Sequence, residues 1–155
     1  MHSAGCRLSA NASHHVRQSI MLSSLPNYVW VLAATYFAAS VAHFTHNAEY
    51  IAFYPNMPSW LSREQVYLAW IAVTCIGVSA LFVLRLGFYA LGVGLVGLYG
   101  AFGLDGLAHY TLALCSEHTL ATNVTIWSEA VSGLLLLLAS AVLLSRSMLA
   151  RARIG

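Results

Sequence analysis

The sequence predicts an all-α fold, a four-helix transmembrane bundle with its N- and C-termini in the cytoplasm. Composition is the first reason, because 59% of the 155 residues are hydrophobic and only 8% are charged, against about 25% charged residues in soluble domains. The second reason is a set of four long apolar runs, since about 20 apolar helical residues cross the roughly 30 Å core of a bilayer. The third is the placement of the arginines, which gives the bundle an orientation.

A soluble domain needs charged groups over its surface, and this chain has too few of them to cover one. We therefore expect a multi-pass membrane protein, which in a prokaryote would lie in the inner membrane. Membrane lipid is the expected partner, and no nucleic-acid partner is expected. The expected parts of the chain are a disordered tail over 1–22, a membrane domain over 23–148 and a basic tail over 149–155.

Local signals place the first two helices, expected at about 27–54 and 62–84. Pro26 precedes the first run, and proline suits the start of a helix. Two prolines within Tyr54–Pro58 end it, because each removes a backbone donor. Ser62, three residues before a glutamine, matches the capping-box pattern at the start of the second helix.

The third and fourth helices are expected at about 87–114 and 122–145. Glycines recur at every third position of the third run, at Gly94, Gly97, Gly100, Gly103 and Gly106. Small residues let membrane helices approach closely, so this ladder predicts a groove that winds around the helix and a homo-oligomer formed through it. Thr122 or Asn123 is the expected cap of the fourth helix.

All but one of the seven basic residues flank the helices on one predicted side. They are Arg7, Arg17, Arg85, Arg146, Arg151 and Arg153. The positive-inside rule makes that side cytoplasmic. All five acidic residues fall on the opposite, outer half together with Arg63. The outer half therefore carries excess negative charge, which a cation or bound protons must balance.

Ionisable residues within membrane spans are costly and usually face the interior of the bundle. His43, His46 and Glu49 are each three residues apart, so we expect them on one strip of the first helix. The third and fourth helices bring further ionisable groups to the same depth. The predicted outward-facing metal site, between the first, third and fourth helices, comprises His43, His46, Glu49, Asp105, His109, His118 and Glu129.

Histidine nitrogen with carboxylate oxygen suits zinc, iron or manganese, and one or two divalent metal ions per chain are expected. Such a site suggests a metal-dependent enzyme, a hydrolase or an oxidoreductase, that acts on a lipid-like substrate. Glu49 or Glu129 is then the expected catalytic base. The sequence contains no motif that fixes a reaction.

Three other interpretations remain open. One is a non-enzymatic role in metal binding or transport, or as an accessory membrane subunit. Another is a b-type haem subunit, in which His43 or His46 and His109 ligate the iron from facing helices. The last is a purely structural polar network that links the helices.

Overall fold

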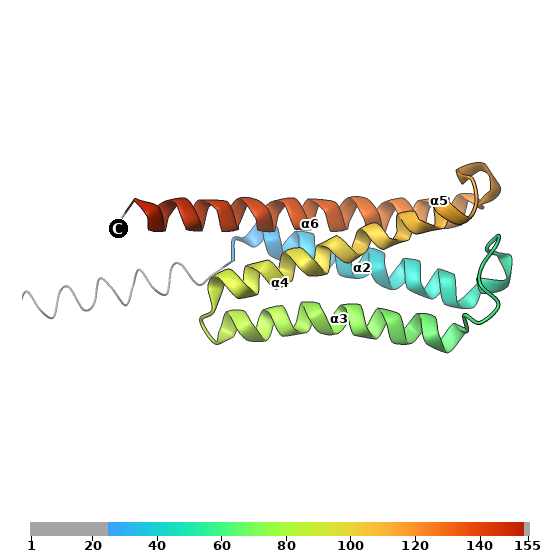
Figure 1. Ribbon diagram of the computed structural model, residues 1–155, viewed down its shortest axis with the longest axis horizontal. Helices are drawn as coiled ribbons and strands as arrows, with labels where there is room; N and C mark the ends of the chain where they lie inside the picture. Colours follow the sequence, from blue (N-terminus) through green and yellow to red (C-terminus); the bar gives the residue numbers. More distant parts are fainter. Residues whose placement is uncertain (1–24, 154–155) are drawn as a thin grey trace, which may run out of the picture.

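The computed structural model describes residues 25–153, and these residues form an elongated bundle of helices without a strand. The long helices are α2 (Asn27–Glu49), α3 (Arg63–Arg85), α4 (Tyr89–Ala101) and α6 (Leu120–Ala152) (Figure 1). The short ones are η1 (Ile51–Phe53), η2 (Phe102–Ala108), α5 (His109–Leu112) and η3 (Cys115–Glu117).

Four segments are long and apolar enough to cross a membrane, the third being the continuous run Tyr89–Leu112. This arrangement confirms the predicted all-α four-helix bundle. The expected tail over 1–22 lies outside the described residues, and the cytoplasmic placement of the termini stays a prediction.

Local signals explain where three of the four long helices begin. Pro26 precedes α2, as predicted. Ser62 and Gln65 form the predicted capping box, in which the Ser62 hydroxyl accepts from the Gln65 amide and the Gln65 side chain accepts from the Ser62 amide. The cap predicted for α6 was wrong, because Thr119 caps that helix by accepting from the amide of Thr122 at 3.1 Å.

The ends of two helices also differ from the prediction. α2 stops at Glu49, and the chain continues to Tyr54 as the separate turn η1, which lets Tyr54 fold back onto the bundle. α6 runs to Ala152 instead of ending near residue 145. The start of the expected basic tail is therefore helical.

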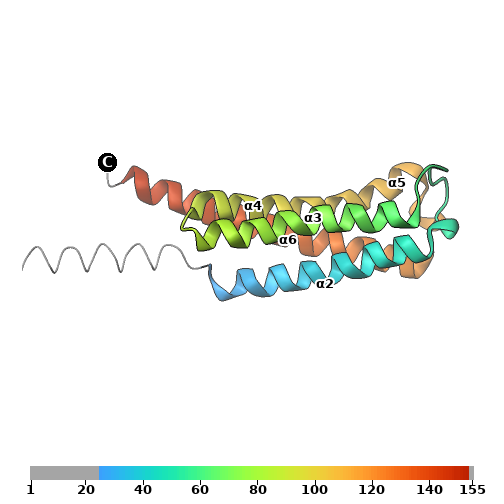
Figure 2. The ribbon, with the colours of Figure 1, turned by 90° about the horizontal axis from the view of Figure 1, so that it is seen from below.

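The bundle has two distinct ends. We call the end with the connections 50–62 and 113–119 the distal end, and the end with Leu25 and the Leu86–Phe88 turn the proximal end. The run from α4 to α5 crosses the bundle, since it starts beside α3 at the proximal end and reaches α6 at the distal end (Figures 1 and 2). α3 packs on α2 and α4 but hardly contacts η2, so the helices diverge towards the distal end.

The glycine ladder adopts a geometry that differs from the predicted winding groove. The α-helix changes to the 3₁₀ helix η2 at Phe102, and a 3₁₀ helix has about three residues per turn, so residues three apart lie above one another. Gly100 and Gly103 face α6 of the same chain: a Cβ atom on them would lie 2.7 Å from the Gly133 oxygen and 2.9 Å from the Glu129 oxygen, respectively. Gly94 has open space around it, and the homo-oligomer stays a prediction.

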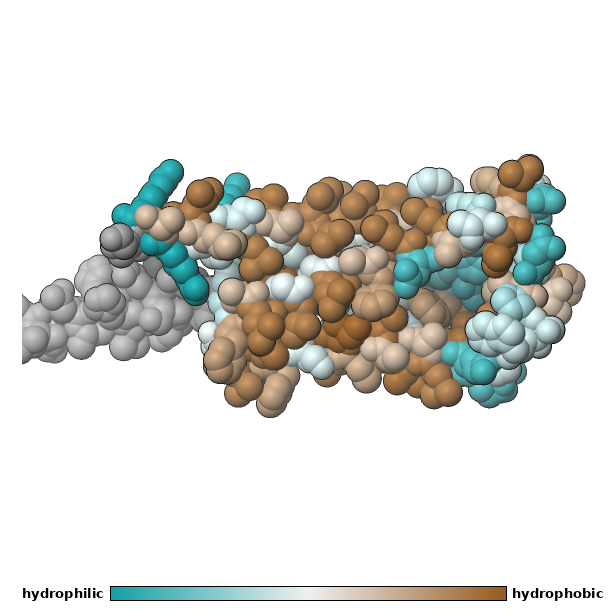
Figure 3. Space-filling model, in the orientation of Figure 1, coloured by the Kyte–Doolittle hydropathy of each residue, from teal (hydrophilic) through white to brown (hydrophobic). Residues whose placement is uncertain are grey.

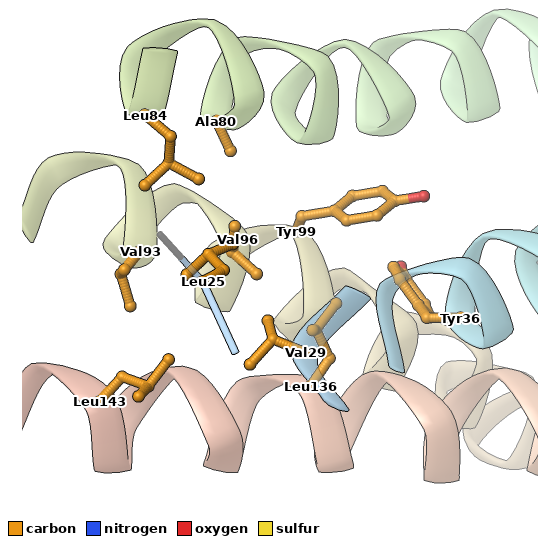
Figure 4. Packing of buried hydrophobic residues seen from close by; sticks show 10 residues of the cluster. All are labelled: Leu25, Val29, Tyr36, Ala80, Leu84, Val93, Val96, Tyr99, Leu136 and Leu143. Atoms are coloured by element: carbon orange, nitrogen blue, oxygen red, sulfur yellow. The ribbon is translucent and has the colours of Figure 1, made fainter. Parts of the chain in front are cut away.

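Apolar packing between α2, α3, α4 and α6 forms the proximal core (Figure 4). Tyr36 and Tyr99 close this core towards the distal end, with their rings edge to face and 4.6 Å between centroids. Outside the core, large apolar side chains such as Phe82, Leu98 and Leu138 are exposed on the sides of the bundle, and hydrophobic residues dominate the face in Figure 3. This surface suits a multi-pass membrane protein.

Candidate functional site

The polar residues of α2 point in three directions, which corrects the predicted single strip. An α-helix turns by about 100° per residue, so residues six apart lie about 120° from each other around the axis. His43 is buried inside the bundle, His46 contacts the Tyr54 hydroxyl at 2.8 Å, and Glu49 pairs on the surface with Arg63 at 2.8 Å. The neighbour of His43 on the inner face is Asn47, four residues on and about 40° away.

His43 is held as a neutral ring by two of its neighbours. The Thr125 hydroxyl already donates to the Thr122 carbonyl at 2.9 Å, so its oxygen accepts from His43 Nδ1, 3.4 Å away. The Asn47 amide nitrogen donates to His43 Nε2 at 2.9 Å. Nε2 is therefore the acceptor nitrogen, and its lone pair faces the centre of the bundle.

Asn47 links two histidines from different helices. Its amide nitrogen lies 2.9 Å from His43 Nε2 and 3.1 Å from His109 Nε2, and an NH2 group has two hydrogens to donate. The two imidazole rings are 5.5 Å apart, edge to face. Because the amide nitrogen occupies the position between the two Nε2 atoms, the haem interpretation gains no support from this geometry.

Glu129 is the buried carboxylate of the site. It comes from α6, is 1% exposed, and its Oε2 lies 3.5 Å from His43 Nε2. Both atoms are acceptors when the carboxylate is ionised, so the contact needs a proton, a hydrogen-bond donor or a cation between them. The other oxygen, Oε1, has no hydrogen-bond partner, and a buried carboxylate without partners is costly.

Gly106 leaves space beside this pair. A Cβ atom at this position would lie 3.4 Å from Glu129 Oε2 and 3.5 Å from His43 Nε2. The glycine is placed there by η2, whose threefold period continues the face of Gly100 and Gly103. The two acceptor atoms are therefore reachable from the hollow between the helices.

That hollow is a cavity of about 470 Å³, which we call the polar cavity. One wall is polar, with His43, Asn47, Asp105, His109 and Glu129. The opposite wall is apolar apart from Gln65 and comes mainly from α3, with residues such as Val66, Ala69 and Val73, while Met57 and Leu61 of the α2–α3 connection also line it. No lysine or arginine lines it.

Asp105 marks where the polar cavity meets the surface. It is exposed, although it belongs to a membrane-crossing segment, and it lies on η2 where the helices diverge from α3. Figure 3 shows a hydrophilic area bordered by hydrophobic residues in the distal half of this face. The 3₁₀ geometry also separates Asp105 from His109, because four residues correspond to one and a third turns there.

Aromatic rings form a second layer towards the distal end. Tyr54 lies against His109, with 5.0 Å between centroids, and His118 lies 6.2 Å from His109. His118 is buried, and neither ring nitrogen has a partner. Burial raises the pKa of the Tyr54 hydroxyl to about 12, so it stays protonated at neutral pH and contacts His46 as a neutral hydroxyl.

Four of the seven predicted site residues thus share the polar cavity, namely His43, Asp105, His109 and Glu129. His118 lies behind His109, whereas His46 and Glu49 lie outside the cavity. Within residues 25–153, no group of three or more His, Cys, Asp or Glu side chains is arranged to hold a metal ion.

Sequence reasoning did not assign roles to Asn47, Gly106 and Thr125. Asn47 had a usable signal, since it lies four residues after His43 on the same helix face. The only sequence signal for Gly106 was its position as the last glycine of the ladder. Thr125 had no such signal.

Comparisons of this chain with protein-family models, with curated proteins and with solved structures each gave no match.

Proposed function

We propose that this chain is a multi-pass membrane protein that binds a lipid-soluble molecule through a hydrogen-bond-donating head group, such as a hydroxyl. The observation that carries the proposal is the pair of facing acceptors, His43 Nε2 and Glu129 Oε2, 3.5 Å apart and buried. A hydroxyl bound between them would donate its one hydrogen to Glu129 Oε2, or to His43 Nε2 when the ligand displaces the Asn47 amide from that nitrogen.

The walls of the polar cavity fit such a ligand. Binding sites for small molecules are largely apolar with a few placed polar groups, and this cavity has one polar and one apolar wall. Because no basic side chain lines it, an anionic head has no counter-charge there. The exposed Asp105 at its edge supports entry from the side, out of the lipid phase.

The proposed role of Glu129 includes that of a base. It is next to the donor position, so it is the group that would accept a proton from a bound hydroxyl. Glu49, the other predicted base, is held on the surface by Arg63 and by the Tyr67 hydroxyl at 2.7 Å. We therefore propose Glu129 and not Glu49 for this role.

A pair of matched probes tests the proposal. In lipid nanodiscs, a radiolabelled long-chain primary alcohol should bind to the protein above the level of empty nanodiscs. Its methyl ether has the same chain but no donor, and it should bind more weakly, by about tenfold or more, since a hydrogen bond to a charged group contributes roughly 1.5–3 kcal/mol. Equal binding of the alcohol and the ether would contradict the proposal.

A divalent metal ion is the second candidate, and the same contact favours it. Two ligands bound tetrahedrally at about 2.0–2.2 Å lie roughly 3.3–3.6 Å apart, and the His43–Glu129 separation is 3.5 Å. Asp105 and His109 line the same cavity, and they would have to move towards the pair to complete a site, because no three such side chains of residues 25–153 are arranged to hold a metal ion. Bound there, zinc, iron or manganese would supply a Lewis acid to an oxygen of the ligand.

Elemental analysis of the detergent-purified protein tests the metal. If a metal is bound, the protein should contain about one zinc, iron or manganese per chain. His43→Ala should lose the metal, and His46→Ala, which removes a histidine outside the polar cavity from the same helix, should retain it. Metal in neither protein, or equal loss from both variants, would contradict binding at this site.

A further inference from the structure

A second cavity lies along the seam between α2 and α3, on the proximal side of the polar cavity. It has a volume of about 350 Å³ and almost entirely apolar walls, and we call it the seam groove. Its lining includes Trp30, Ala34 and Phe37 of α2, and Thr74 and Val78 of α3. Both cavities are therefore bounded by α2 and α3, while α4 completes the seam groove and η2, α5 and α6 complete the polar cavity.

Tyr99 explains why the seam is open. Its ring lies against Gly77 of α3, where a Cβ atom would be 3.1 Å from the ring, and against Tyr36 of α2. Small residues usually bring membrane helices together. Here Gly77 instead makes room for a ring inserted between α3 and α2, so small residues such as Ala34 line a hollow.

Tyr99 lines the seam groove and not the polar cavity. Figure 4 shows its side chain reaching from α4 into the space between α3 and α2, with the hydroxyl pointing towards the distal end. The hydroxyl is buried and has no hydrogen-bond partner.

The length of the combined site suits one extended chain. Trp30 and His43 are thirteen residues apart on α2, a rise of about 20 Å at 1.5 Å per residue. This span exceeds the depth of one leaflet, about half of the roughly 30 Å core. A long single chain would fill it, whereas a short chain would reach the polar cavity alone.

We infer that the seam groove holds the tail of the molecule whose head binds in the polar cavity, so that the ligand is a long, single-chain amphiphile with a donor head. The inference rests on the proposed function and adds the ligand's class and the position of its tail. The groove explains why an apolar hollow persists beside a polar one: the two serve opposite ends of one molecule.

The test uses a long-chain primary alcohol with a photoreactive diazirine at the far end of its chain, bound to the protein in nanodiscs. Mass spectrometry should locate the cross-links on α2 around residues 30–37 and on α3 around residues 74–81. Ala34→Trp fills the groove and should reduce these cross-links about tenfold, as expected when roughly two methylene groups lose their site. Ala141→Trp, on the exposed side of α6, is the matched control and should leave them unchanged.

Competition by a short-chain primary alcohol separates this inference from the proposed function. The short alcohol should displace the probe equally well from the wild type and from Ala34→Trp, because its site is the polar cavity. If it competes but the cross-links are spread evenly over the lipid-facing helices, the tail assignment is wrong and the head site stands. If it does not compete and the long alcohol does not bind, the proposed function itself is contradicted.

Discussion

Replacing Glu129 with leucine should stabilise the fold and abolish binding of the long-chain alcohol. Glu129 is 1% exposed, its Oε1 has no partner, and its Oε2 faces an acceptor nitrogen. Exchange of poorly paired buried charges for apolar residues of similar size is often neutral or stabilising, by about 1–4 kcal/mol. Thermal unfolding in detergent should therefore show an unchanged or higher Tm.

The opposite result would identify Glu129 as a structural residue. Leu136→Ala removes a fully buried side chain from the same helix and should cost about 2–5 kcal/mol, which calibrates the assay for α6. Glu49→Gln breaks a surface ion pair and should change stability by less than about 1 kcal/mol. A fall in Tm for Glu129→Leu as large as that for Leu136→Ala would favour the polar-network interpretation.

Gly103→Val should destabilise the fold strongly, because this glycine of the ladder lies against the backbone of α6. A Cβ atom there would lie 2.7 Å from the Tyr36 ring and 2.9 Å from the Glu129 backbone oxygen. The second of these atoms belongs to the backbone of α6 and cannot rotate away. Overpacking of a tight contact costs about 1–3 kcal/mol or more, and this contact also sets the position of η2.

The matched control is Gly94→Val, which introduces the same side chain on the same segment where nothing lies within 4 Å. Unfolding in detergent should show a marked loss of Tm for Gly103→Val and little change for Gly94→Val. Equal effects of the two substitutions would contradict the close approach of η2 to α6. Binding of the long-chain alcohol should also fall in Gly103→Val, since η2 carries Asp105 and Gly106.

The fold was predictable because its signals are local and cumulative. Four apolar runs, a scarcity of charge and cues such as Ser62 with Gln65 specify helices without knowledge of their packing. The depth of the ionisable residues was predictable for the same reason, since it follows from position along each run. His43, Asp105, His109 and Glu129 accordingly line one cavity.

The direction of each side chain was less predictable. Residues three apart on an α-helix differ in direction by about 60° around the helix axis. His43 and Glu49 therefore point in different directions, although each is only three residues from His46. The change to a 3₁₀ helix at Phe102 rotates Asp105 away from His109. The sequence before Phe102 contains no signal that predicts this change. The return of Tyr54 to the bundle depends on tertiary contacts with His46 and His109.

The most direct test of the account compares two alanine variants of α2 in the nanodisc binding assay. His43 lies in the polar cavity and His46 lies outside it, on the Tyr54 hydroxyl. His43→Ala should weaken binding of the long-chain alcohol about tenfold or more, as expected for the loss of a buried acceptor, and His46→Ala should retain it. Equal affinities of the two variants, or a loss confined to His46→Ala, would contradict a head-group site at His43 and Glu129.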